Sequence, residues 1–96
     1  MTIRLGPRWY TLDGHTPVPT TDLVEAMQNR PHVALTEKGK VSVSTVFLGI
    51  DHSFFEGPPL VFETMIFGGE HDGWQDRCST WEEAEAMHAR ACALLA

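Results

Sequence analysis

Basic residues are scarce in this chain, and their shortage excludes the most common classes of charged partner. Lys and Arg together number seven among 96 residues, against 13 Asp and Glu, so the formal net charge is −6 with neutral histidines. The closest basic pair, Lys38 and Lys40, flanks a turn glycine, and no cluster of cations is available to neutralise phosphates. Binding to nucleic acid is therefore disfavoured, and the same acidity argues against anionic membrane surfaces.

Cysteine and long apolar runs are also scarce. Cys78 and Cys92 lack the spacing of a zinc motif, so we interpret them as reduced thiols and expect no metal and no cofactor. Residues 2–10 contain no apolar run of the signal-peptide type, and no stretch approaches the roughly 18 apolar residues of a spanning helix. These absences predict a cytoplasmic protein.

The composition is that of a globular domain. Hydrophobic residues make up 43% of the chain and charged residues 21%. A length of 96 residues predicts one domain, residues 1–96, with a small core. Because small cores give thin stability margins, a partner or a second copy of the chain would add stability.

The first third of the chain contains strong turn and helix signals. Asp13-Gly14 is a turn signal after the strand-forming residues 9–12, and the prolines in residues 16–19 require an extended backbone. A helix is predicted from Asp22 to Arg30, since Asp22 with Glu25 resembles a capping box and Pro31 cannot continue the helix. Its predicted buried face consists of Leu23, Ala26, Met27 and Arg30.

Strand patterns follow in the middle of the chain. We predict strands over residues 32–37, 41–48 and 60–67, and a short additional strand over 74–77. The strand over 60–67 is apolar on both faces except at Glu63 and Thr64, which is typical of a central strand covered at least partly on both sides.

The last helix has the clearest signal. Two registers of a capping box are open, Ser79 with Glu82 or Thr80 with Glu83. Glutamates in the opening turns complement the helix dipole, and Arg90 lies towards the far end. The residues with helical spacing that form its apolar stripe are Trp81, Ala84, Met87, Ala91, Leu94 and Leu95.

This order predicts an α+β fold. Short connections favour antiparallel pairing, so we expect a two-layer sandwich in which a sheet of four to five strands carries both helices on one face. If Val61, Met65 and Phe67 project from the other face, it is too apolar for water. A homodimer through that open sheet face is then the prediction, with a partner protein as the other way to cover it.

A metal or acid/base site is the sharpest chemical hypothesis. His and carboxylate ligands suit zinc or manganese, and the candidate residues are Asp51, His52, Glu63, His71, Asp72 and Asp76. If the strands over 41–48 and 60–67 form a hairpin, Asp51 and His52 lie at one end, and His71 and Asp72 lie at the other. Extended residues at roughly 3.3 Å each separate these ends by about 25 Å, so no single site uses both pairs.

Asp51 and the residues after it have a plainer interpretation. Asp and Ser at the start of a loop commonly accept hydrogen bonds from nearby backbone amides. Phe54 and Phe55 either face solvent, where aromatic residues anchor partners, or pack beneath the prolines at 58 and 59. The residues predicted to contact a partner are therefore Phe54, Phe55 and Trp74, with Asp51 and Glu56 beside them.

Glu63 and His88 are the polar residues placed within apolar patterns. Glu63 is exposed on the open face, paired with a cation such as Arg77, or raised in pKa for proton transfer. His88 beside the last helix's apolar stripe is interpreted as a satisfied, partly buried histidine. His52, Glu63, His71 and Asp72 together are kept as a candidate polar site.

The chain resembles a group of small uncharacterised proteins of actinobacteria and their bacteriophages. Three strings carry the resemblance: TVFLGIDH at 45–52, GPPLVFETMIFGG at 57–69 and STWEEA at 79–84. It covers about half of the chain, from Thr45 to His88. Cys78 and Met87 depart from the group, in which an aromatic residue and a glycine occupy those places. The resemblance implies a cytoplasmic bacterial or phage accessory protein and assigns no catalytic residue.

These observations favour a non-enzymatic module that binds another protein, of the bacterial host or of the phage. One alternative is a small metal-dependent or acid/base enzyme that uses Asp51, His52 and Glu63. A second alternative is a self-assembling virion or structural component.

Overall fold

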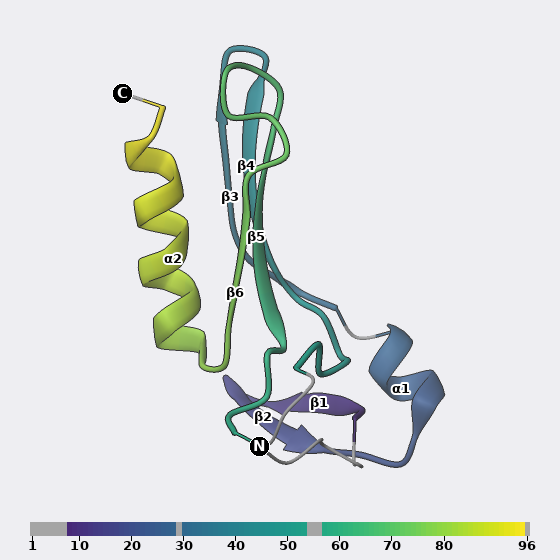
Figure 1. Ribbon diagram of the computed structural model, residues 1–96. Coiled ribbons are helices and arrows are strands. Elements are labelled where there is room, and N and C mark those ends of the chain that lie inside the picture. Colours follow the sequence, from purple (N-terminus) through teal and green to yellow (C-terminus); the bar gives the residue numbers. More distant parts are fainter. Residues whose placement is uncertain (1–7, 29, 54–56, 96) are drawn as a thin grey trace.

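The computed structural model describes residues 8–28, 30–53 and 57–95, and Figure 1 shows their arrangement. Six strands and two helices occur in the order β1 (Tyr10–Asp13), β2 (Thr16–Pro19), α1 (Leu23–Gln28), β3 (His32–Lys38), β4 (Val41–Phe47), β5 (Phe62–Phe67), β6 (Gln75–Cys78) and α2 (Trp81–Ala93). This confirms the predicted α+β class.

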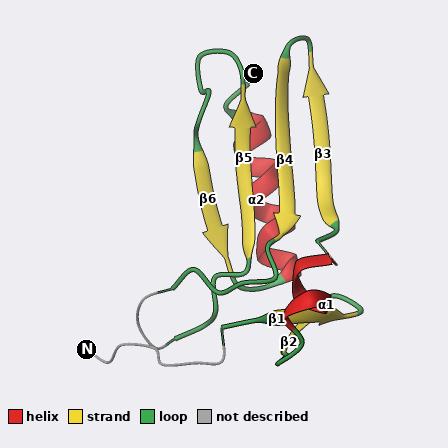
Figure 2. Ribbon diagram, turned by 90° about the vertical axis from the view of Figure 1, so that its right-hand side faces the viewer, coloured by secondary structure: helices red, strands yellow, loops and turns green. Residues whose placement is uncertain are grey.

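A four-stranded antiparallel sheet is the main layer. Its strand order is β3-β4-β5-β6, so every pairing joins strands that are consecutive in the chain. Helix α2 runs along one face of this sheet and contacts all four strands, which gives the two-layer arrangement seen in Figure 2. The two central strands are β4 and β5, as the doubly apolar pattern of residues 60–67 predicts.

The strand period of two divides the sheet into a helix-covered face and an open face. On the helix-covered face, alternate residues of β4 and β5 are fully buried: Val43, Thr45, Phe47, Phe62, Thr64 and Ile66. On the open face no described helix lies over the sheet, and Leu35 and Phe67 are 54% and 49% exposed. Of the residues expected on this face, Met65 and Phe67 lie there, whereas Val61 is fully buried in the core.

The core has two apolar clusters. The first gathers Phe47, Phe62 and Ala84 with Tyr10 and Val61, and the second gathers Val43, Ile66 and Ala91. Both clusters take residues from β4, β5 and one side of α2. The apolar stripe of α2 thus packs against the buried face of the two central strands.

Helix α2 begins with a capping box in the second of the two registers. The Thr80 side chain accepts a hydrogen bond from the Glu83 amide, and the Glu83 carboxylate accepts one from the Thr80 amide. The buried side of α2 is Ala84, Met87, His88 and Ala91, whereas Leu94 is 40% exposed.

Helix α1 differs from the prediction in length, burial and position. It ends at Gln28, and Ala26 is its one buried residue among those described, while Leu23 and Met27 are 46% and 48% exposed. It packs against β1 at the end of the molecule and does not share the sheet face that α2 covers (Figure 1). Six residues give fewer than two turns, so α1 presents too little apolar surface to cover a sheet.

Strands β1 and β2 form a hairpin separate from the main sheet. Its turn carries Gly14 with φ 62°, in agreement with the Asp13-Gly14 signal. The hairpin joins the rest of the fold through Gly49, whose carbonyl accepts a hydrogen bond from the Tyr10 amide at 3.0 Å. Residues 16–19, predicted only as extended, are therefore a strand because they pair with β1.

Gly49 also sets how closely α1 approaches the end of β4. It has φ 75°, and a Cβ at this position would collide with the Ala26 carbonyl oxygen. A side chain there would thus be strained by its backbone conformation and would push α1 away.

We expect Gly49→Ala to lower the free energy of unfolding by about 3 kcal/mol, because it adds a clash to the cost of the left-handed conformation. Gly39→Ala is the matched control, since Gly39 has φ 62° and open space around it, and should cost about 1 kcal/mol. Urea unfolding measures both. Equal losses in the two variants would contradict the close packing of α1 on Gly49.

Candidate functional site

Asp51 organises the loop that follows β4. It is fully buried, and its Oδ1 accepts hydrogen bonds from the Ser53 amide at 2.8 Å, the Ser53 hydroxyl at 2.7 Å and the Leu60 amide at 2.9 Å. These bonds tie the two ends of the loop together, as the plainer interpretation of Asp51 predicts. A buried carboxylate presents no surface, so Asp51 is removed from the predicted contact residues.

The other predicted contact residues divide into two groups. Phe54, Phe55 and Glu56 lie outside the described residues. Trp74 is half-buried and packs against the cluster of Val43, Ile66 and Ala91. Part of its ring therefore contributes to the core and is not available to a partner.

Glu63 lies on the open face and forms an ion pair with Arg77, with Oε2 at 2.9 Å from Nε. The pairing with Arg77 is therefore the correct interpretation of this carboxylate. His52 lies within electrostatic reach of both groups. Burial and the Arg77 charge lower the pKa of His52, and the Glu63 charge opposes them.

His71 and Asp72 belong to the turn between β5 and β6, at the opposite end of β5. The Gly68 amide donates to Asp72 Oδ1 at 2.6 Å, and the Trp74 amide donates to the His71 carbonyl at 3.0 Å. The structure thus places His52 within electrostatic reach of Glu63, and it places His71 and Asp72 at the opposite end of β5. Across the described ranges, no group of three or more His, Cys, Asp or Glu side chains is arranged to hold a metal ion.

His88 connects α2 to three strands through hydroxyl groups. Its Nδ1 is 2.7 Å from Thr45 Oγ1, its Nε2 is 2.9 Å from Thr36 Oγ1, and Thr45 in turn is hydrogen-bonded to Thr64. Burial lowers the pKa of His88, so the neutral ring is favoured inside the fold. This arrangement is the satisfied, partly buried histidine that the helical pattern predicts.

The two cysteines have no activated setting. Burial raises the pKa of the Cys78 thiol to about 11, and its Sγ donates to the Thr80 carbonyl at 3.7 Å. Because the thiolate is the reactive form, a thiol of this pKa is a poor nucleophile at neutral pH. Cys92 packs beside the second apolar cluster, and both thiols are free.

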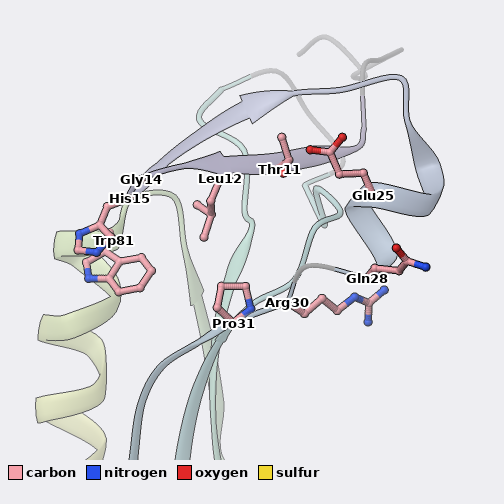
Figure 3. Close-up of a pocket in the computed structure, with 9 residues that line it drawn as sticks. All are labelled: Thr11, Leu12, Gly14, His15, Glu25, Gln28, Arg30, Pro31 and Trp81. Atoms are coloured by element: carbon pink, nitrogen blue, oxygen red, sulfur yellow. The ribbon is translucent and has the colours of Figure 1, made fainter.

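A groove of about 740 Å³ lies between the β1–β2 hairpin, α1 and the first turn of α2, and we call it the α1 groove. Its volume is within the usual range of ligand sites. The lining residues are labelled in Figure 3: Thr11, Leu12, Gly14, His15, Glu25, Gln28, Arg30, Pro31 and Trp81. Its lining is divided between polar and apolar side chains.

The two ends of the α1 groove differ in chemistry (Figure 3). At one end the His15 ring stacks on the Trp81 indole, with ring centroids 3.7 Å apart and planes at 1°. Phe62 meets the same indole edge-on at 6.1 Å, which holds Trp81 in place from the core side. At the other end lie Arg30 and Gln28, two side chains with N–H donors, together with the Glu25 carboxylate.

An apolar patch adjoins this groove on α1. Leu23, Val24 and Met27 are 46%, 62% and 48% exposed, and we call them the α1 patch. Glu25 and Gln28 of the same short helix line the groove, so patch and groove are neighbours. Apolar side chains gathered on one exposed helix are typical of a surface that meets another protein.

The sequence interpretation missed the α1 groove for an identifiable reason. Thr16-Pro17-Val18-Pro19 after an Asp-Gly turn signals a hairpin with residues 10–13, and that pairing brings His15 towards Trp81. Residues 16–19 were predicted only as extended, so no position followed for His15. Arg30 was predicted on the buried face of the first helix, whereas the structure leaves it exposed. Trp81 was assigned to the core, where one edge of its indole does pack.

No protein-family model matches this chain, and no curated protein and no solved structure matches it. Within the described ranges, no helix combines the length and apolarity needed to cross a membrane.

Acidification is expected to destabilise the fold through His88. A folded pKa below the unfolded value means that the unfolded chain binds the proton first, so stability is complete above about pH 6.5 and falls as the pH drops towards the folded pKa. Urea unfolding at about pH 7.5 and about pH 5.5 should show this loss in the wild type and a smaller loss in His88→Gln.

His32→Gln is the control for removal of an imidazole, because His32 is exposed on β3 and takes no part in the hydrogen-bonded chain of His88 with Thr36 and Thr45. A His88→Gln variant that loses as much stability on acidification as the wild type would contradict the role of His88.

Proposed function

We propose that this protein is a non-enzymatic module that binds another protein through the α1 groove and the α1 patch. The single observation that supports the proposal most is that α1 buries only Ala26 among its described residues and leaves its other apolar side chains exposed beside an open groove. A helix this short costs backbone entropy to order and contributes little to the core, so its exposed side chains are available for binding.

The charges of the chain fit a protein partner better than a nucleic acid. The net charge is −6, and the groove offers one guanidinium, from Arg30, and one carboxylate, from Glu25. A mixed lining with aromatic and amide groups resembles the core and rim of protein interfaces. In keeping with the resemblance stated above, the proposed setting is the cytoplasm of an actinobacterium, with a host or phage protein as partner.

Capture of partners from an actinobacterial lysate tests this function. We expect the tagged wild type to capture one partner protein in nearly equimolar amount. The Val24→Asp variant should capture at least about tenfold less of this partner, since a charge buried in the interface opposes an apolar contact. Val24 is 62% exposed, so the substitution leaves the core intact. Quantitative mass spectrometry gives the readout.

Leu35→Asp is the matched control, because Leu35 is a 54% exposed leucine on the open face, away from α1. A double Phe54→Ala, Phe55→Ala variant separately tests the loop that the sequence favoured. Equal capture by Val24→Asp and the wild type would remove the α1 patch from the proposal.

A second candidate function is self-association through the open face of the main sheet. Leu35 and Phe67 are about half exposed there, and Val46 and Met65 add partly buried apolar area. Four strands of this length span roughly 400 Å² of projected area, about half of the 800 Å² per partner in standard interfaces. We therefore propose a weak homodimer, the simplest form of the structural-component alternative.

Light scattering from micromolar to submillimolar concentration should show the mass rise towards that of a dimer. A double Leu35→Glu, Phe67→Glu variant should stay monomeric, because like charges would face each other across the two-fold axis. Leu94→Glu adds a charge at an exposed leucine that caps the end of α2, and this variant should dimerise as the wild type does. A monomeric mass at every concentration would contradict the dimer.

A further inference from the structure

The backbone of β1 has an unpaired edge where it borders the α1 groove. In the hairpin, the Thr20 amide donates to the Trp9 carbonyl, so Trp9 and Thr20 form a hydrogen-bonded pair and the pairs alternate from there. Leu12, opposite Pro17, is consequently in a non-hydrogen-bonded pair, and its N–H and C=O point away from β2. Among the residues that the structure describes, no backbone or side-chain partner is recorded for the Leu12 amide.

The same edge is already used for pairing one step earlier. The Tyr10 amide donates to the Gly49 carbonyl, and the Asp51 amide donates to the Arg8 carbonyl, which places Trp9 and Ile50 in an antiparallel bridge. After Tyr10 this pairing stops, because the chain on the Gly49 side turns into β4. The edge from Tyr10 to Asp13 therefore continues this ladder to a position where no described residue pairs with Leu12.

The other edge of the hairpin cannot accept a strand in the same way. Pro17 and Pro19 occupy the outward-facing positions of β2, opposite Leu12 and Tyr10. Proline has no N–H, so this edge lacks the donors that a further strand requires. The hairpin is thus open to strand addition on the β1 side alone.

The α1 groove runs along the open edge of β1. Thr11 and Leu12 both line it, although consecutive strand residues point to opposite faces. A groove lined by both Thr11 and Leu12 therefore extends around the edge of β1 that faces away from β2. Figure 3 shows Leu12 and Pro31 between the aromatic end and the Arg30 end, so an extended segment beside β1 would meet both ends.

The charge at the Arg30 end indicates the kind of segment. Arg30 is exposed and lies beside Gln28, and its Nη2 donates to the Met27 sulfur at 2.7 Å. Neither Arg30 nor Glu25, the one carboxylate of the groove lining, takes part in the ion pairs found among the described residues. A guanidinium next to an amide group recognises a carboxylate.

We propose that the α1 groove binds an extended, acidic peptide segment of a partner protein, which adds as a strand to the open edge of β1. Main-chain hydrogen bonds to Leu12 supply affinity, and an acidic side chain on Arg30 with an apolar side chain over the His15–Trp81 stack supplies specificity. This inference rests on the proposed binding function and specifies its partner.

The test uses synthetic peptides chosen from a display library of random sequences of about ten residues, selected against the full chain. We expect the selected peptides to carry an Asp or Glu, and NMR hydrogen exchange should show the Leu12 amide slowed by at least about tenfold when a peptide is bound. Leu12→Pro removes this donor and should weaken binding by about tenfold, the equivalent of one backbone hydrogen bond.

Leu12→Val is the matched control, since it keeps the N–H with a similar side chain and should bind within about twofold of the wild type. Arg30→Gln should weaken binding of the acidic peptide and leave its Asn or Gln counterpart unaffected. The hydrogen-exchange measurement needs no variant, so it decides the question even if Leu12→Pro fails to fold.

Three results would overturn strand addition: peptides that bind without slowing the Leu12 amide, equal binding by Leu12→Pro and Leu12→Val, or a selection that returns no binding peptide. The binding function would survive any of these if Val24→Asp still abolished capture of a cellular partner. If Val24→Asp captured as much partner as the wild type while a bound peptide slowed exchange of the Leu12 amide, the α1 groove would remain the proposed binding site. The α1 patch would then no longer belong to it.

Discussion

The hydrogen-bonded chain from Thr64 through Thr45 to His88 and Thr36 is the constraint on which the rest of this fold depends. It lies between the two apolar clusters of the core and joins three strands to α2. A slip of one residue between β4 and β5 would turn Thr45 to the open face and leave buried polar groups without partners, at about 1–3 kcal/mol for each group. The polar layer therefore selects one register where an all-apolar core would tolerate several.

The neighbouring β5–β6 pairing determines which charged groups meet on the open face. It places Glu63 opposite Arg77, and the charges of both act on His52. The chain leaves β4 at Gly49, where the absence of a side chain lets α1 and the β1–β2 hairpin approach. The α1 groove lies beside this approach, between the hairpin, α1 and the first turn of α2, and none of its lining residues belongs to the polar layer.

Periodicity was sufficient to predict the main sheet and α2, because burial there is repetitive. Alternation over residues 41–48 and the apolar spacing after Thr80 identify elements that pack along their whole length. Glu63 with Arg77 and the satisfied His88 were among the predicted alternatives, since few partners exist for a buried polar group. The separation of His52 from His71 followed from strand length alone.

Prediction failed where a single contact decides the outcome. The position of α1 depends on the approach of Ala26 to Gly49, which no pattern of apolar residues encodes, and the expected buried face of Leu23 and Met27 is exposed. Asp51 was assigned to a partner surface although its carboxylate closes the loop from within. Long-range contacts of this kind appear in the sequence only as isolated glycines and acids.

The order of strands along the chain also bears on how the molecule folds. Each pairing of the main sheet joins strands that are consecutive in the chain, which keeps the contact order of the sheet low. The longest connection, residues 48–61, joins the two central strands. Helix α2 comes last in the chain and supplies the ring that satisfies the threonine hydroxyls. Until α2 docks, the hydroxyls of Thr36 and Thr45 lack this partner on that face of the sheet, and water must satisfy them.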